Sequence, residues 1–168
     1  ISSFVCEEEY LLAQKFKEYG YVIRPVTDYK LFERIQSLVA DIAAKFLGYS
    51  FDKKETFLNL IHQQINSEEL NELRVQLIRQ MNAVPWFRSS YFQLARPALE
   101  ALVGNELAMQ LRVNLSIQLP KDDSSLLPVH ADVWSGDSPF EVVIWVPLVN
   151  CFRSKSMFLL PPKDENKL

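Results

Sequence analysis

Two residues with metal-binding side chains lie two positions apart in the second half of this chain. His130 and Asp132 occupy the run LLPVHADVW, which reads as a β-strand. Because successive side chains of a strand point to opposite faces, the imidazole and the carboxylate should project together. One histidine and one carboxylate are two of the three ligands in the 2-His-1-carboxylate site of non-haem Fe(II) oxygenases. The spacing therefore predicts part of an iron site, with His130 and Asp132 as metal ligands and catalytic residues.

The third ligand of such a site is not found after this pair. The chain contains two histidines, and the other one, His62, lies far upstream within a helical pattern. A histidine in that pattern is expected on a helix surface rather than at a metal. A second explanation of the pair also stays open, in which His130 is satisfied by a neighbouring carboxylate at a surface turn.

Three further polar residues are candidates for holding a cofactor. Residues 111–119 alternate apolar and polar side chains, and Asn114 and Gln118 belong to the polar series. They line a pocket if this sheet curves into a cup, and otherwise they face water. Lys155 precedes an apolar run, where it could pair with a carboxylate or extend its ammonium group into solvent.

The chain divides into two halves with different patterns. The first 110 residues are expected to be mainly helical, with Gly20 and Gly48 ending two helices and Pro97 in the first turn of another. Residues 111–162 read as short strands joined by turns, which is typical of a sandwich or barrel. The expected helices cover residues 7–19, 29–47, 54–66, 67–81 and 89–103. Together these patterns predict one α+β domain over residues 1–168.

Composition limits the partners and the compartment. A net charge of -3 without a cluster of Lys or Arg argues against nucleic-acid binding. No apolar run reaches the length of about 20 residues that crosses a bilayer, so no membrane partner is expected. The two cysteines show neither disulfide-framework nor metal-ligand spacing, which favours a reducing, cytoplasmic location.

The order of these features resembles one enzyme family. His130-Ala131-Asp132 is followed by a Val/Ile/Trp strand that ends in Val-Pro-Leu, and then by Lys155 and a Leu-Pro-Pro end. This order resembles the Fe(II)/2-oxoglutarate dioxygenases of the phytanoyl-CoA dioxygenase type. It is more closely similar to the bacterial oxygenases found sporadically in surface-carbohydrate gene clusters. The likeness is closest over residues 114–162.

The resemblance implies a fold and a cofactor set. It implies a double-stranded β-helix (jelly-roll, cupin-like) core with the helical half packed on it. It implies Fe(II) bound by His130, Asp132 and a distal histidine, and 2-oxoglutarate whose far carboxylate is held by Lys155. The distal histidine and the later strands would follow Leu168, so we expect the core to be incomplete here and the natural protein to continue.

The expected function is Fe(II)- and 2-oxoglutarate-dependent oxidation of a small molecule by O2. The expected substrate is a carbohydrate or sugar-nucleotide intermediate of surface-polysaccharide biosynthesis. One alternative is a non-catalytic jelly-roll binding module that lacks a complete metal site. Another is a cupin-like metal isomerase, although such sites usually gather more histidines than this chain contains. The sequence leaves the oligomeric state open.

Overall fold

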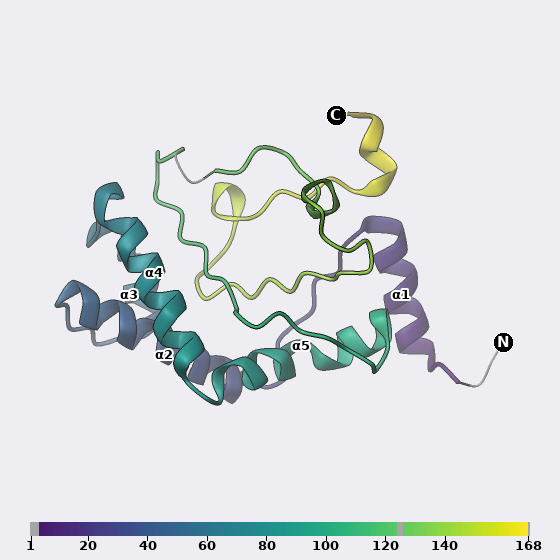
Figure 1. The fold of residues 1–168 in the computed structure, drawn as a ribbon, viewed down its shortest axis with the longest axis horizontal. Helices are drawn as coiled ribbons and strands as arrows, with labels where there is room; N and C mark the ends of the chain where they lie inside the picture. Colours follow the sequence, from purple (N-terminus) through teal and green to yellow (C-terminus); the bar gives the residue numbers. More distant parts are fainter. Residues whose placement is uncertain (1–3, 124–125, 168) are drawn as a thin grey trace.

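The computed structural model describes residues 4–123 and 126–167 of the chain, and α-helices occupy its first two thirds. Figure 1 shows these helices as a curved row, with the chain that follows α5 folded back over the concave side of the row. None of the described helices combines the length and apolar character needed to cross a membrane. The α-helices are α1 (Glu7–Tyr19), α2 (Tyr29–Leu47), α3 (Lys54–Asn59), α4 (Ser67–Ala83) and α5 (Phe87–Val103), and short 3-10 helices are η1 (Ile61–Gln63), η2 (Asp132–Ser135), η3 (Arg153–Lys155) and η4 (Pro162–Lys167).

Local capping residues set the ends of the helices. The side-chain oxygen of Asp28 accepts a hydrogen bond from the backbone N–H of Leu31 at 2.9 Å, which satisfies a free donor at the start of α2. Gly20 ends α1 in the left-handed conformation with φ 75°, where a side chain would be strained. A Cβ atom on Gly20 would also lie 3.0 Å from the Cδ atom of Pro162. The predicted helices 7–19 and 29–47 are confirmed at both ends.

The hydrophobic core lies between α2, α4 and α5. Leu73 and Leu77 of α4 are fully buried against Ile35 and other apolar residues of α2. Burial of one such side chain stabilises the fold by about 1.5–3 kcal/mol. The core is therefore built from helices, and the other buried members of this cluster include Val39, Ala40, Ala43, Phe57, Met81, Phe87 and Val113.

Two expectations about the helices need adjustment. The predicted helix 54–66 ends at Asn59 and is followed by the single turn of η1. Pro97 lies well inside α5 rather than in its first turn. Pro97 has no N–H to donate within the helix, yet α5 continues because its residues on both sides of the proline, Ser90 and Leu99, are buried against the rest of the protein.

The predicted strands are not formed in the part of the chain that the structure describes. Residues 113–119 and 141–147 run as extended segments without helix, turn or bend, but no β-ladder joins them to each other or to another described segment. The predicted α+β fold with a jelly-roll core is therefore wrong, and the regular structure of the described residues is helical. The alternation itself is correct in one respect, because Val113 is buried while Asn114 and Gln118 are exposed.

Side chains of the helices replace the missing ladder for the first extended segment. Asn82 of α4 accepts from the N–H of Val113 at 2.8 Å and donates to its carbonyl at 2.9 Å. Arg88 of α5 donates to the carbonyls of Met109 and Gln110, and Arg74 of α4 donates to that of Ile117. Buried backbone groups need partners, and here the helical layer supplies them. This explains why a strand-like sequence lies on helices without a partner strand.

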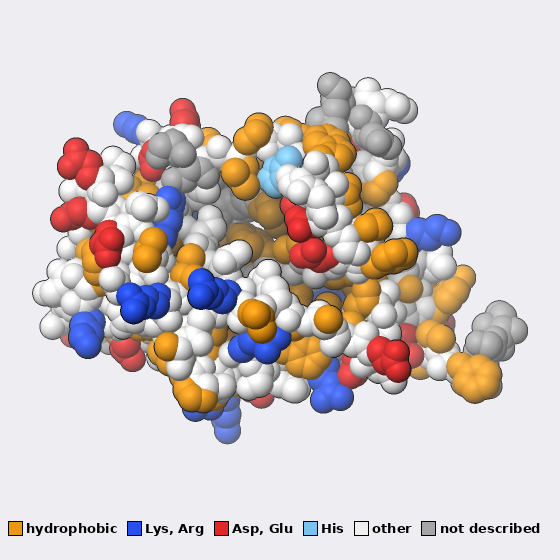
Figure 2. Space-filling model, viewed as in Figure 1, with side chains coloured by type: hydrophobic (Ala, Val, Ile, Leu, Met, Phe, Trp, Pro, Cys, Tyr) orange, Lys and Arg blue, Asp and Glu red, His pale blue; other side chains and the backbone are white. Residues whose placement is uncertain are grey.

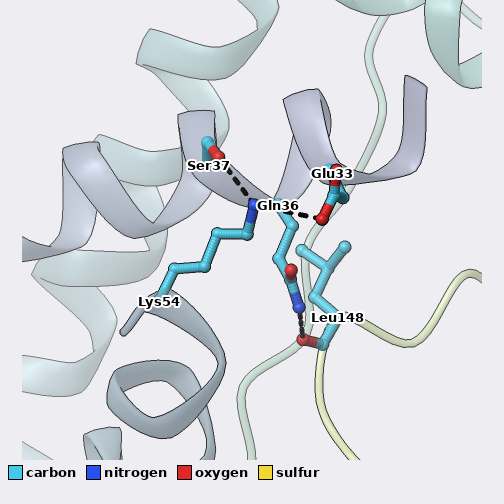
Figure 3. Close-up of polar contacts among 5 residues, drawn as sticks. All are labelled: Glu33, Gln36, Ser37, Lys54 and Leu148. Atoms are coloured by element: carbon cyan, nitrogen blue, oxygen red, sulfur yellow. Dashed lines mark hydrogen bonds and ion pairs between the residues drawn. The ribbon is translucent and has the colours of Figure 1, made fainter. Parts of the chain in front are cut away.

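The second extended segment is held in the same way. The side-chain amide of Gln36, which is buried on α2, donates to the carbonyl of Leu148 at 2.8 Å (Figure 3). The hydroxyl of Tyr91 on α5 donates to the carbonyl of Ile144, also at 2.8 Å. Figure 3 shows Lys54 reaching α2 beside this contact, with its Nζ atom 3.2 Å from the Ser37 hydroxyl. The helix α2 thus contacts both α3 and the second extended segment.

Candidate metal site

His130 and Asp132 lie side by side, although not on a strand. His130 directly follows a bend at Val129, and Asp132 is the first residue of the 3-10 helix η2. The Nε2 atom of His130 is 3.5 Å from the Oδ1 atom of Asp132. The i, i+2 spacing therefore brings the two side chains together through a loop and a helical turn.

A backbone carbonyl fixes the orientation of the imidazole ring. The Nδ1 atom of His130 is 2.7 Å from the carbonyl oxygen of Pro128. A carbonyl can only accept, so Nδ1 carries the proton and donates it to that oxygen. In the neutral ring, Nε2 then keeps its lone pair and faces the carboxylate of Asp132. Histidines that bind metals commonly donate their other N–H to a carbonyl in this way.

The Nε2 atom of His130 and the Oδ1 atom of Asp132 both carry lone pairs, so they repel each other unless a cation lies near them. For His130 and Asp132 that cation is either a proton on Nε2 or a metal ion. Two ligands bound at about 2.1 Å are about 3.0 Å apart at an octahedral right angle and about 3.4 Å apart at a tetrahedral angle. The observed separation of 3.5 Å is close to the tetrahedral value and about 0.5 Å longer than the octahedral one. This donor pair therefore fits a divalent transition metal after a small movement of one side chain.

The pair alone is an incomplete metal site. Within residues 4–123 and 126–167, no group of three or more His, Cys, Asp or Glu side chains comes close enough to hold a metal ion. The side chains of His130 and Asp132 are 41% and 50% exposed, respectively, so water reaches both. Tight binding then requires ligand atoms from another source, such as the two adjacent oxygens of a 2-oxoacid.

The other predicted cofactor residues lie in different surroundings. The ammonium group of Lys155 donates to the Oδ1 atom of Asn59 at 3.3 Å, and the same oxygen accepts from the N–H of Asn150 at 3.1 Å. Lys155 thus helps to tie the η3 loop to the end of α3. Asn114 and Gln118 lie on the exposed side of their extended segment.

Two open clefts were not predicted from the sequence. One has a volume of about 350 Å³ and is lined on one side by the rings of Tyr49, Phe51 and Phe57. The Phe57 ring stacks between the other two, with centroids 5.4 and 5.0 Å away. The second, of about 380 Å³, is lined by His62 and Lys121 among others. The spacing of aromatic residues around α3 could have indicated the first cleft. The second cleft is lined by segments that are distant from each other in the sequence.

Comparison with known proteins gave no match to a family, to a curated protein or to a solved structure. The described residues are helical and extended, without the strands that the phytanoyl-CoA dioxygenase type requires. The assignment to that family, and with it the description of the chain as a jelly-roll dioxygenase, is therefore wrong. The geometry of His130 and Asp132 is the feature of the described residues that points to metal chemistry.

Proposed function

We propose that this chain binds Fe(II) through His130 and Asp132 and uses it, with 2-oxoglutarate and O2, to oxidise a small molecule. The observation that supports the proposal is the orientation of the imidazole, whose Nδ1 is 2.7 Å from the Pro128 carbonyl while Nε2 faces the Asp132 carboxylate. Imidazole and carboxylate are the ligand types of non-haem Fe(II) oxygenases. A cytoplasmic location belongs to the same proposal.

Each protein group has a distinct role in this scheme. The Pro128 carbonyl holds the ring in the tautomer that leaves Nε2 free, and the Asp132 carboxylate offsets part of the positive charge of the metal. Bound Fe(II) would supply a centre where O2 reacts while the 2-oxoacid is decarboxylated. Trp134, which is exposed within η2, offers an apolar surface beside Asp132 on which a small substrate could rest.

Anaerobic titration of Fe(II) in the presence of 2-oxoglutarate tests the proposal. We expect saturable binding and a visible charge-transfer band from the chelated iron. His130→Ala should weaken Fe(II) binding by at least about tenfold, because one of two protein ligands is lost. His62→Ala is the matched control and should bind as the wild-type protein does. Equal binding by the wild-type protein and His130→Ala would remove this pair as the site.

A second candidate is a non-catalytic binding module. Its support is that the described residues around the pair offer two ligands, both well exposed to water. His130 and Asp132 would then form a surface pair without a metal. Iron-dependent consumption of 2-oxoglutarate separates the two functions. Consumption that is lost in Asp132→Ala supports the enzyme, whereas no consumption by any form supports the binding module.

A further inference from the structure

The extended segment of residues 141–147 presents an unusual surface. Val142, Ile144 and Val146 are half-buried, whereas Val143 and Trp145 are 63% and 47% exposed. Figure 2 shows hydrophobic side chains gathered over much of the face on which the second half of the chain lies. The segment therefore has the two-sided pattern of a strand that is covered on one side only.

The two edges of this segment differ in their hydrogen bonds. In an extended chain, alternate residues direct their N–H and C=O groups to opposite edges. The carbonyl of Ile144, on one edge, is bound by Tyr91 of α5, and the carbonyl of Leu148, at the bend that follows, is bound by Gln36 of α2. On the other edge, the N–H and C=O groups of Val143 and Trp145 have no partner among the described residues. An edge of this kind is a template for pairing with another strand.

We propose that a second copy of this chain pairs with this edge as an antiparallel strand, with the two-fold axis at Ile144. Val143 then lies opposite Trp145 of the second copy, and these two residues exchange two hydrogen bonds. By symmetry, Trp145 exchanges two hydrogen bonds with Val143 of the second copy. Aromatic and β-branched residues are favourable neighbours across strands. The pairing would thus satisfy the free backbone groups of Val143 and Trp145 and bring their exposed side chains into contact with those of the other copy.

The residues that flank this pair fit a strand of the same sequence. In this register Glu141 lies opposite Pro147 of the second copy, so its carboxylate does not face a like charge. Pro147 has no N–H to donate, and the N–H of Glu141 is already bound to the Ser138 carbonyl at 3.0 Å. The run from Phe140 to Val146 carries one charge, is rich in β-branched and aromatic residues and lacks proline, which is typical of segments that self-associate.

Sedimentation or light scattering over a range of concentrations tests the pairing. We expect a reversible dimer, and Val143→Lys should raise its dissociation constant by at least about tenfold because the paired surface gains charge. Val75→Lys is the matched control, since Val75 is 50% exposed on α4 and lies on a helix. A wild-type chain that stays monomeric throughout, or a Val143→Lys dimer of unchanged affinity, would overturn the proposal.

Amide hydrogen exchange tests the register independently of any substitution. On dimer formation the N–H groups of Val143 and Trp145 should become protected, while those of Val142 and Val146 should not, because they point to the other edge. Protection of neither Val143 nor Trp145 in a dimer would place the interface elsewhere and refute the pairing.

Discussion

Asn82 is the side chain that best tests how the second half of the chain is held on the helices. Its amide exchanges two hydrogen bonds with the backbone of Val113, at 2.8 and 2.9 Å, and its Nδ2 atom also donates to the Ile78 carbonyl at 2.7 Å. Val113 is 5% exposed, so water cannot easily replace this amide. We therefore predict that Asn82→Ala loosens the extended segment from α4 and destabilises the protein.

The size of the effect follows from the groups left without partners. A buried backbone donor or acceptor that loses its hydrogen bond costs about 1–3 kcal/mol. Asn82→Ala leaves one buried donor and one buried acceptor of Val113 without partners, so we expect the free energy of unfolding to fall by about 2–6 kcal/mol. Asn82→Asp keeps the acceptor for the Val113 N–H but directs a carboxylate at the Val113 carbonyl. Its free energy of unfolding should also fall.

Urea denaturation measures this loss, and amide exchange locates it. Asn114→Ala is the matched control, because Asn114 neighbours Val113 but is exposed, and exposed substitutions usually change stability by less than about 0.5 kcal/mol. The Val113 amide should exchange much faster in Asn82→Ala than in the control. An Asn82→Ala variant within about 0.5 kcal/mol of the wild-type protein, with Val113 still protected, would show that the segment is held by other means.

Three other predictions concern stability at high pH, the core and the metal pair. Burial raises the pKa of Tyr91 from 10.0 to about 12; the folded protein therefore holds this proton more tightly, and stability should fall by about 2–3 kcal/mol between pH 10 and 12. Denaturation of Tyr91→Phe over the same range should show a smaller fall. Leu77→Ala should cost about 2–5 kcal/mol in urea denaturation, because Leu77 is fully buried. Calorimetry at several pH values should show Fe(II) affinity falling in acid, because a proton competes for Nε2 of His130; a pH-independent affinity would contradict this ligand.

The helices could be predicted because the signals that define them are local. Asp28 lies three residues before Leu31, whose N–H it accepts, and Gly48 directly follows the last residue of α2. An apolar stripe at helical spacing then marks the face that becomes buried. Where the signal was weaker, as at Pro97, the prediction failed, because burial of the residues around it overrides the local preference against proline.

The extended half could be predicted only in part. Alternation in residues 111–119 correctly indicated that one side is buried, but a layer of helices covers one side of an extended chain as well as a sheet does. The hydrogen-bond partner of each backbone group decides whether the segment joins a sheet or lies on helices, and those partners are distant in sequence. Asn82 and Val113 are 31 positions apart, and Tyr91 and Ile144 are 53 apart. No local pattern reports such pairs, which is why strands were expected where side chains of helices bind the backbone.

For the candidate site too, local features could be predicted from the sequence and distant contacts could not. The proximity of His130 and Asp132 is a local property, because residues two apart stay close in an extended chain and at the start of a turn. The roles expected for Lys155, Asn114 and Gln118 required a closed sheet, and without it Lys155 binds Asn59 instead. The feature that matters most for chemistry, the Pro128 carbonyl that sets the tautomer of His130, arises from a bend that the sequence pattern did not show. A metal site inferred from residue types is therefore strengthened here by one backbone oxygen, because that oxygen decides which ring nitrogen is free to bind.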